Sequence, residues 1–172
     1  ISGDCVSVNA YMKDGKMIFF MLSDREAVSD LSGGTTTAYH IPSKYEGKKV
    51  HSEIYELARY VTNKLEIRNG PVCFEITVSE NTPYLNEVTP CLDGSHLWRL
   101  IYLYCGVNLL EMTVSHLLSE NGPDMPMAEK KKASWHLEFF CEKPGTVFNA
   151  EKYKNYTAEY KEMYYRTGDT VK

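Results

Sequence analysis

The segment Phe74–Pro90 reads FEITVSENTPYLNEVTP, and its pattern predicts a β-hairpin. Apolar residues alternate with polar ones on both sides of the short polar turn SENTP, as they do in half-buried antiparallel strands. If the turn centres on Asn81, Glu75 lies directly opposite Glu87. The hairpin would then hold two carboxylates face to face.

This register divides the side chains of the hairpin between two faces, because side chains alternate along a strand. One face would carry the pairs Glu75 with Glu87, Cys73 with Thr89 and Thr77 with Leu85. The other face would carry the mainly apolar set Phe74, Ile76, Val78, Tyr84, Asn86 and Val88, which we expect to meet the core. A slip of one residue would move one glutamate to the other face.

Two opposed carboxylates need a neutralising partner. Directly opposed residues have Cβ atoms about 5 Å apart, and like charges at that distance destabilise a sheet. A nearby arginine or lysine, a shared proton or a divalent cation would each relieve the repulsion. Mg²⁺ prefers oxygen ligands, and the Thr89 hydroxyl would lie on the same face. The spacing alone favours a solvent-exposed pair that binds nothing.

The sequence that follows Glu87 adds an anion-binding element. The stretch EVTPCLDGSHLW leads through Pro90 and Gly94 into a helix. The N–H groups and the dipole at a helix N-terminus favour a phosphate or a carboxylate. Paired carboxylates, an oxygen-preferring metal and such a helix start together suit nucleotide phosphoryl chemistry.

The rest of the chain predicts an α+β fold, in which helices cover an antiparallel β-sheet. Two strands joined by the turn KDGK precede the loop DLSGGTTT, which we interpret as a connection rather than a phosphate loop. Residues 52–65 have helical spacing, with Ser52 as the expected N-cap. We expect further helices at residues 94–105, closed by Gly106, and 109–119, capped by Asn108 with Glu111. A strand is expected from Trp135.

Composition excludes several classes of protein. The 172 residues are 43% hydrophobic and carry a formal net charge of −4, which argues against nucleic-acid binding. The five cysteines have no disulfide or zinc-site spacing. The apolar stretch from Leu97 to Leu118 is interrupted by polar residues and fits two buried helices better than a membrane span. We therefore expect a cytoplasmic protein that binds neither membranes nor nucleic acid.

At the level of motifs, Asn69–Glu111 resembles the C-terminal lobe of the ATP-grasp ligases. The similarity is to biotin carboxylase, the large subunit of carbamoyl-phosphate synthase and related amino-acid ligases. It rests on Glu75, on NEVTPC with Glu87, on the loop LDGSH and on GVNL from Gly106. The upstream SGDCVSVNAYMKDGKMIF also resembles a hairpin of this family, so the resemblance covers residues 2–119 in order.

The resemblance implies a role for each matched position. Glu75 and Glu87 would bind one or two Mg²⁺ or Mn²⁺ ions that bridge the phosphates of ATP, and Thr89 stands where the family has a metal-binding asparagine. Thr77 would line the adenine pocket, and Arg25 would contact phosphate. The loop that touches the acceptor substrate would contain Cys91, Asp93, Gly94 and Ser95.

The implied activity is that of an ATP- and Mg²⁺-dependent ligase. Such an enzyme activates a small carboxylate as an acyl phosphate and joins it to an amine. Residues 1–122 would be the C-terminal lobe of the ATP-grasp domain and residues 123–172 a strand-rich extension. We expect the chain to be a fragment that lacks the N-terminal half and has no turnover by itself; a homodimer is left open.

Three positions depart from the family pattern, and two of them, Thr89 and Cys91, favour an alternative. Thr89 replaces asparagine, Cys91 replaces an arginine that would stabilise an acyl phosphate, and Cys5 stands near the place of an acidic residue. The alternative is a catalytically degenerate nucleotide-binding or regulatory module with the same fold. An interaction module that uses the tyrosine-rich tail is a third interpretation.

Overall fold

The computed structural model describes residues 1–28, 35–119, 122–124 and 126–172, which form two compact units, Ile1–Glu138 and Phe139–Lys172. The boundary that we expected from the sequence lay between residues 122 and 123. The Gly33–Gly34 pair of the expected connecting loop lies outside the described residues. Each unit is described below by itself.

In its described residues, the first unit contains a six-stranded sheet with the strand order β5-β4-β1-β2-β3-β6, in which all neighbours are antiparallel. The strands are β1 (Asp4–Lys13), β2 (Lys16–Val28), β3 (Thr35–Ile41), β4 (Gly70–Ser79), β5 (Thr82–Thr89) and β6 (Trp135–Glu138). The stretch TTT at residues 35–37, which we expected in a loop, begins β3 instead. This architecture confirms the predicted α+β fold.

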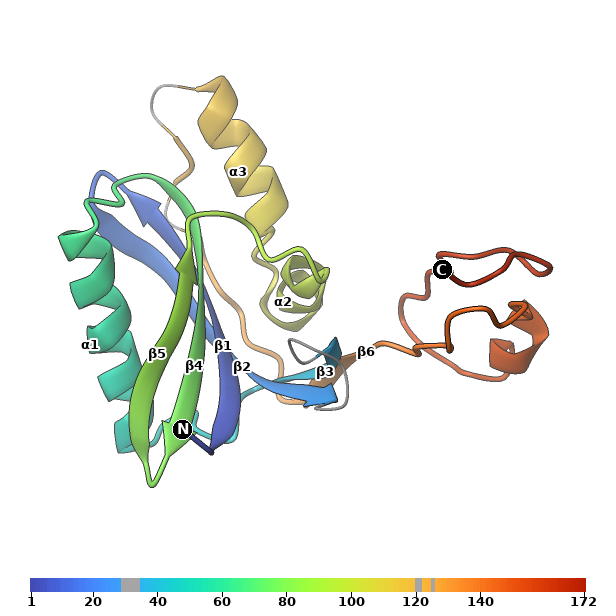
Figure 1. Cartoon of the computed structure of the whole chain (residues 1–172). Helices are drawn as coiled ribbons and strands as arrows, with labels where there is room; N and C mark the ends of the chain where they lie inside the picture. The colour runs from blue at the N-terminus through green and yellow to red at the C-terminus, as the bar shows by residue number, and fades with distance from the viewer. Residues whose placement is uncertain (29–34, 120–121, 125) are drawn as a thin grey trace. The chain divides into compact units, whose positions relative to one another are not determined.

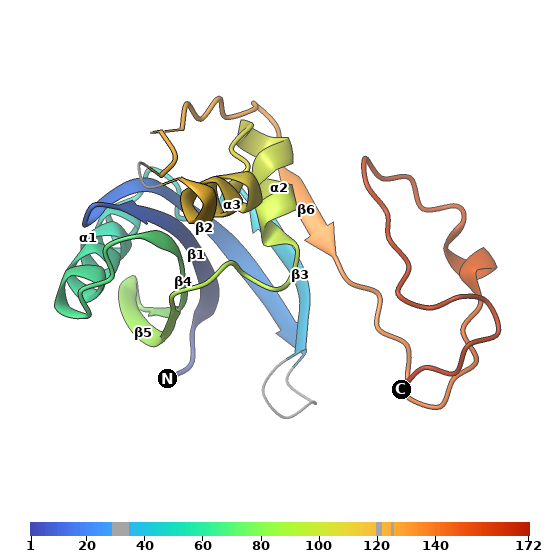
Figure 2. The same ribbon diagram turned by 90° about the horizontal axis from the view of Figure 1, so that it is seen from above.

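Helices cover both faces of the sheet (Figures 1 and 2). They are α1 (Lys49–Lys64), α2 (Leu97–Cys105) and α3 (Leu109–Leu118). Helix α1 lies on one face, and α2 and α3 lie on the other (Figure 1). The β5–α2 connection runs across to the second face, so the segment that follows Glu87 arrives on the side of α2.

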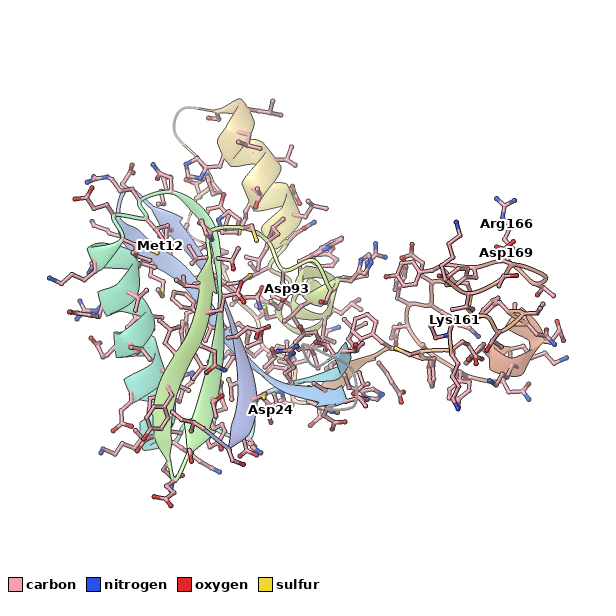
Figure 3. The ribbon with its side chains drawn as sticks, in the orientation of Figure 1. Met12, Asp24, Asp93, Lys161, Arg166 and Asp169 are labelled. Atoms are coloured by element: carbon pink, nitrogen blue, oxygen red, sulfur yellow. The ribbon has the colours of Figure 1, made fainter. Side chains whose placement is uncertain are left out.

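The main core lies between the sheet and α1. Phe74 and Ile76 of β4 pack there with Val8 of β1 and with Ile54 of α1, and all four are almost fully buried. Figure 3 labels Met12, which belongs to the same core. The apolar face that the sequence predicts for β4 is therefore confirmed. On β5, Val88 packs against this core as expected, whereas Tyr84 is 40% exposed and pairs with Thr77 rather than with a core residue.

The start of α1 agrees better with the burial of its apolar residues than with the capping residue predicted from the sequence. Helix α1 begins at Lys49, with Lys48 as an N-cap that makes no side-chain hydrogen bond, so the prediction of Ser52 as the cap is wrong. The helix starts earlier because Val50 is already buried under the sheet. Asn108 does cap α3, since its Oδ1 accepts the N–H of Glu111 at 3.2 Å.

No single helix in the described part of the chain is both long enough and apolar enough to cross a membrane. By length and composition only, α2 and α3 pass that test together as a pair bent by 105°. In α2, the side chains of Leu97, Leu100 and Ile101 are buried inside the first unit.

The start of β1 is tied to the loop after β3 by Asp4. Its Oδ2 accepts a hydrogen bond from the Tyr45 hydroxyl at 2.5 Å and lies 2.7 Å from Lys44 Nζ. The hydrogen bonds from Lys44 and Tyr45 lower the pKa of Asp4 below its ordinary value of 3.8. Burial, followed by the bond to Asp4, raises the pKa of Tyr45 to about 12.

We expect Tyr45→Phe to lower the free energy of unfolding by about 1 kcal/mol at pH 7, because the Asp4 carboxylate loses a hydrogen bond. A carboxyl whose folded pKa is lowered stabilises the protein above its unfolded pKa, and this stability is lost as the pH falls through the folded pKa. The difference between the proteins should therefore shrink below pH about 3.8. Urea unfolding at pH 7 and pH 3 measures it, with Tyr102→Phe at an exposed site as the control.

The second unit has a small aromatic core made of Phe148, Tyr153 and Val171. Its regular structure in the described residues is the 3-10 helix η1 (Ala150–Tyr153) and one bridge between Val147 and Thr170, where we expected strands. Figure 3 labels Arg166 and Asp169, whose backbone N–H and Oδ2 are joined at 2.7 Å.

Candidate functional site

The β4–β5 hairpin places Glu75 directly opposite Glu87, and Cys73 opposite Thr89, as predicted. The turn differs from the expected one. Glu80 and Asn81 both have positive φ, of 50° and 62°, which is typical of a two-residue hairpin turn.

A β-bulge restores the register between the turn and the glutamates. Ile76 pairs with Leu85 and Glu75 with Glu87, so Asn86 is the extra residue. Thr77 therefore pairs with Tyr84, and the expected pair with Leu85 is wrong. The Asn86 Nδ2 donates to Thr77 Oγ1 at 2.8 Å, which fixes the buried Thr77 hydroxyl.

A polar row continues from Glu75 across the neighbouring strands. In β1, Ser7 pairs with Glu75 and Asn9 with Cys73, and Ser7 also pairs with Ser23 of β2. The side chains of Ser7, Asn9 and Ser23 are all buried, although each is polar. This row lies on the α2–α3 side of the sheet.

Arg25 neutralises Glu75. Its Nη1 lies 2.9 Å from Glu75 Oε1, and the two side chains are 14% and 42% exposed. The Arg25 Nε–H also donates to Thr36 Oγ1 at 2.7 Å. Of the three ways to relieve the repulsion, the structure shows an arginine at Glu75. At the other carboxylate, the Thr89 hydroxyl donates to Glu87 Oε1 at 2.9 Å.

The loop between β5 and α2 folds onto this polar row. The Cys91 N–H donates to the Thr89 carbonyl at 2.9 Å, and the Cys91 carbonyl accepts from Cys73 Sγ at 3.2 Å. Asp93 Oδ1 accepts the N–H of Ser95 at 2.8 Å. Figure 3 labels Asp93 in this loop, beside the sheet and α2.

The start of α2 lies later than we predicted. The N-cap is His96, which has a left-handed backbone and makes no side-chain capping bond, and the helix begins at Leu97 rather than at Gly94. A Cβ added at Gly94 would meet no atom within 4 Å, so this point of the loop faces open space. Gly94 is accordingly exposed.

The charge of Asp93 acts on two buried groups, the Cys73 thiol and the Tyr39 hydroxyl. Burial raises the pKa of the Cys73 thiol, and the charges of Asp93 and Cys91 raise it further. Burial also raises the pKa of Tyr39, again followed by the charge of Asp93. Both groups stay neutral near pH 7, so Cys73 is a poor nucleophile here.

Several functional-site residues on this face of the sheet were not predicted from the sequence. Thr36 holds Arg25, but it lies in a stretch that we assigned to a loop. Tyr39 is the β-sheet partner of Arg25. Among the described residues, Asn9 Nδ2 is a buried donor without a hydrogen-bond partner.

A cavity of about 410 Å³ opens beside Arg25. Its lining residues are Asp4, Cys5, Asp24, Arg25, Glu26, His40 and Lys44. Cys5 stands here, where the family resemblance suggests an acidic residue.

The donor set fits a magnesium-type ion. Glu75 and Glu87 supply opposed carboxylates, and Thr89 supplies a hydroxyl beside Glu87. In residues 1–28, 35–119, 122–124 and 126–172, no group of three or more His, Cys, Asp or Glu side chains could hold a metal. Mg²⁺ is often held by one or two carboxylates together with substrate phosphates.

Solved structures with a similar fold include a synthetase, an amino acid ligase and a biotin carboxylase. Phosphoribosylglycinamide synthetase from Anaerococcus prevotii has a TM-score of 0.81 and 16% identity, over 100% of this chain and 44% of that chain. The chain has an ATP-grasp subdomain fold. The L-amino acid ligase from Bacillus licheniformis has a TM-score of 0.77 and 16% identity, over 99% of this chain and 43% of that chain.

The biotin carboxylase from Campylobacter jejuni, solved as a beta-gamma-ATP complex, has a TM-score of 0.55 and 16% identity, over 72% of this chain and 26% of that chain. The chain thus spans less than half the length of each of these structures. No family model and no curated protein matches its sequence. Because the identities are low, the likeness concerns the fold.

Proposed function

We propose that this chain is the metal- and phosphate-binding lobe of an ATP-dependent ligase. The ligase would activate a small carboxylate as an acyl phosphate and join it to an amine. The observation that carries the proposal is the direct pairing of Glu75 with Glu87 on one face of the sheet. The ATP-grasp fold, shared with several ligases, supports it.

In this proposal the paired acids position the nucleotide. Glu75, Glu87 and Thr89 would hold Mg²⁺ or Mn²⁺, which neutralises charge on the β- and γ-phosphates when it is bound. Arg25 would contact a phosphate oxygen, because its guanidinium lies at the same carboxylate and beside an open cavity. Thr77, whose hydroxyl accepts a hydrogen bond from Asn86, would line the adenine pocket.

The β5–α2 loop would receive the acceptor carboxylate. Cys91, Asp93, Gly94 and Ser95 bring backbone groups over the polar row next to the acids. Asp93 fixes the loop by accepting the Ser95 N–H with its Oδ1. The protein would contribute alignment and charge stabilisation, since phosphoryl transfer requires little covalent help.

One observation favours the second candidate function, a nucleotide-binding module without turnover. Cys91 leaves the loop without the fixed positive charge that an arginine would give to an acyl phosphate. Arg25 lies nearby, but in this structure it is paired with Glu75. In such a module ATP would bind with its metal, and no acyl phosphate would form.

The experiment that separates these functions measures nucleotide binding and turnover. We expect the 172-residue chain to bind ATP weakly by calorimetry, and only when Mg²⁺ or Mn²⁺ is present, because the acids reach the phosphates through the metal. The full-length polypeptide is then screened with carboxylates and amines for release of ADP and phosphate. Release supports the ligase, and binding without release supports the second function. ATP binding that is equally tight with and without the metal would contradict both functions.

A further inference from the structure

The Arg25–Glu75 ion pair spans three strands of the sheet. Arg25 lies in β2 and Glu75 in β4, with β1 between them. The β1 residue beside Glu75 is Ser7, whose small side chain leaves room for the long arginine. The pair therefore joins two strands that do not pair with each other.

The geometry holds the guanidinium more firmly than the carboxylate. The Arg25 side chain is 14% exposed and its Nε–H is bonded to Thr36 on β3, whereas the Glu75 side chain is 42% exposed. Glu75 Oε1 lies 2.9 Å from Arg25 Nη1. A divalent cation held by that oxygen would stand next to a positive guanidinium, and neighbouring like charges repel. Arginine and metal therefore compete for Glu75.

We propose that Arg25 is an exchangeable counter-ion, which holds Glu75 until a polyphosphate binds the guanidinium and the carboxylate passes to the metal. This inference rests on the proposed function. This exchange makes metal binding and polyphosphate binding mutually dependent. The phosphates pair with the guanidinium of Arg25, and the released Glu75 carboxylate then binds the cation. By reciprocity, each ligand then raises the affinity for the other by the same factor.

The test measures Mn²⁺ affinity by electron paramagnetic resonance, with and without inorganic tripolyphosphate. In the wild-type chain, tripolyphosphate should raise Mn²⁺ affinity at least about tenfold. Arg25→Gln should bind Mn²⁺ alone at least about fivefold more tightly than wild type, and tripolyphosphate should add much less, because the counter-ion is gone. Arg59→Gln is the matched control, since Arg59 is an exposed arginine paired with Glu56 on α1.

A second readout does not depend on the glutamine variant. The Nε–H resonance of Arg25 should shift when tripolyphosphate and Mg²⁺ are added to wild-type protein. The Arg59 resonance should not move. Arg25→Lys keeps the positive charge but loses the planar, two-pronged donor geometry of the guanidinium. It should therefore retain part of the coupling between Mn²⁺ and tripolyphosphate binding.

The outcomes distinguish this inference from the function on which it rests. Suppose that Glu75→Gln weakens Mn²⁺ binding but Arg25→Gln behaves like Arg59→Gln. The proposed exchange at Arg25 is then wrong, whereas the assignment of Glu75 as a metal ligand is supported. If Glu75→Gln leaves Mn²⁺ binding unchanged in both conditions, the metal site itself is wrong, and the exchange falls with it.

Discussion

Replacing Glu87 with glutamine is expected to lower the affinity for Mn²⁺ in the presence of ATP by about a hundredfold, or roughly 3 kcal/mol. Glu87 is one of the two opposed carboxylates, and Arg25 lies at the other. A glutamine keeps the size of the side chain and its bond to the Thr89 hydroxyl, but it removes the charge that attracts the cation. Calorimetric titration of Mn²⁺ in the presence of ATP measures the loss.

Glu80→Gln provides the matched control for this experiment. Glu80 is an exposed glutamate in the turn of the same hairpin, so its replacement makes the same change in net charge away from the acid pair. We expect its Mn²⁺ affinity to stay within a factor of about two of wild type, because exposed charges are well screened. Equal affinities for the two variants would exclude Glu87 as a metal ligand.

The opposite face of the same hairpin should give the largest effect on stability. Phe74→Ala is expected to lower the free energy of unfolding by about 3–5 kcal/mol, because it removes apolar contacts and leaves a cavity. Phe74 is 1% exposed and packs in the core between the sheet and α1. Urea unfolding followed by circular dichroism measures the change.

Leu117→Ala is the control for the loss of an apolar side chain. Leu117 in α3 is 81% exposed, so its removal should change the free energy of unfolding by less than about 0.5 kcal/mol. A Phe74→Ala variant that loses less than about 1 kcal/mol would show that the α1 face is not the main core.

Much of the acid pair could be predicted from the sequence. Alternation along a strand is local, so Glu75 and Phe74 had to lie on opposite faces. The pairing of Glu75 with Glu87 was also correct, although the turn was not. The two-residue turn at Glu80–Asn81 shifts the register by one residue, and the bulge at Asn86 shifts it back.

The burial of polar groups on the α2–α3 side could not be predicted in the same way. Ser7 and Asn9 read as the polar half of an alternating strand, which is also the pattern of an exposed face. Helices from later in the chain cover that side: the hydroxyl of Tyr11, on the same face of β1, donates to the Met112 carbonyl of α3 at 3.0 Å. Thr36 was missed because the strand signal of TTT is weak next to two glycines.

The sequence by itself determined that this protein opposes two carboxylates within one hairpin and places an apolar face behind them. Both features follow from residues close in the chain, whose alternation and pairing obey local geometry. Only the tertiary structure decided that Arg25 neutralises Glu75, because those residues are 50 positions apart and meet through the order of the strands. That order depends on which faces the helices bury, a balance of packing across the whole sheet that no local pattern contains.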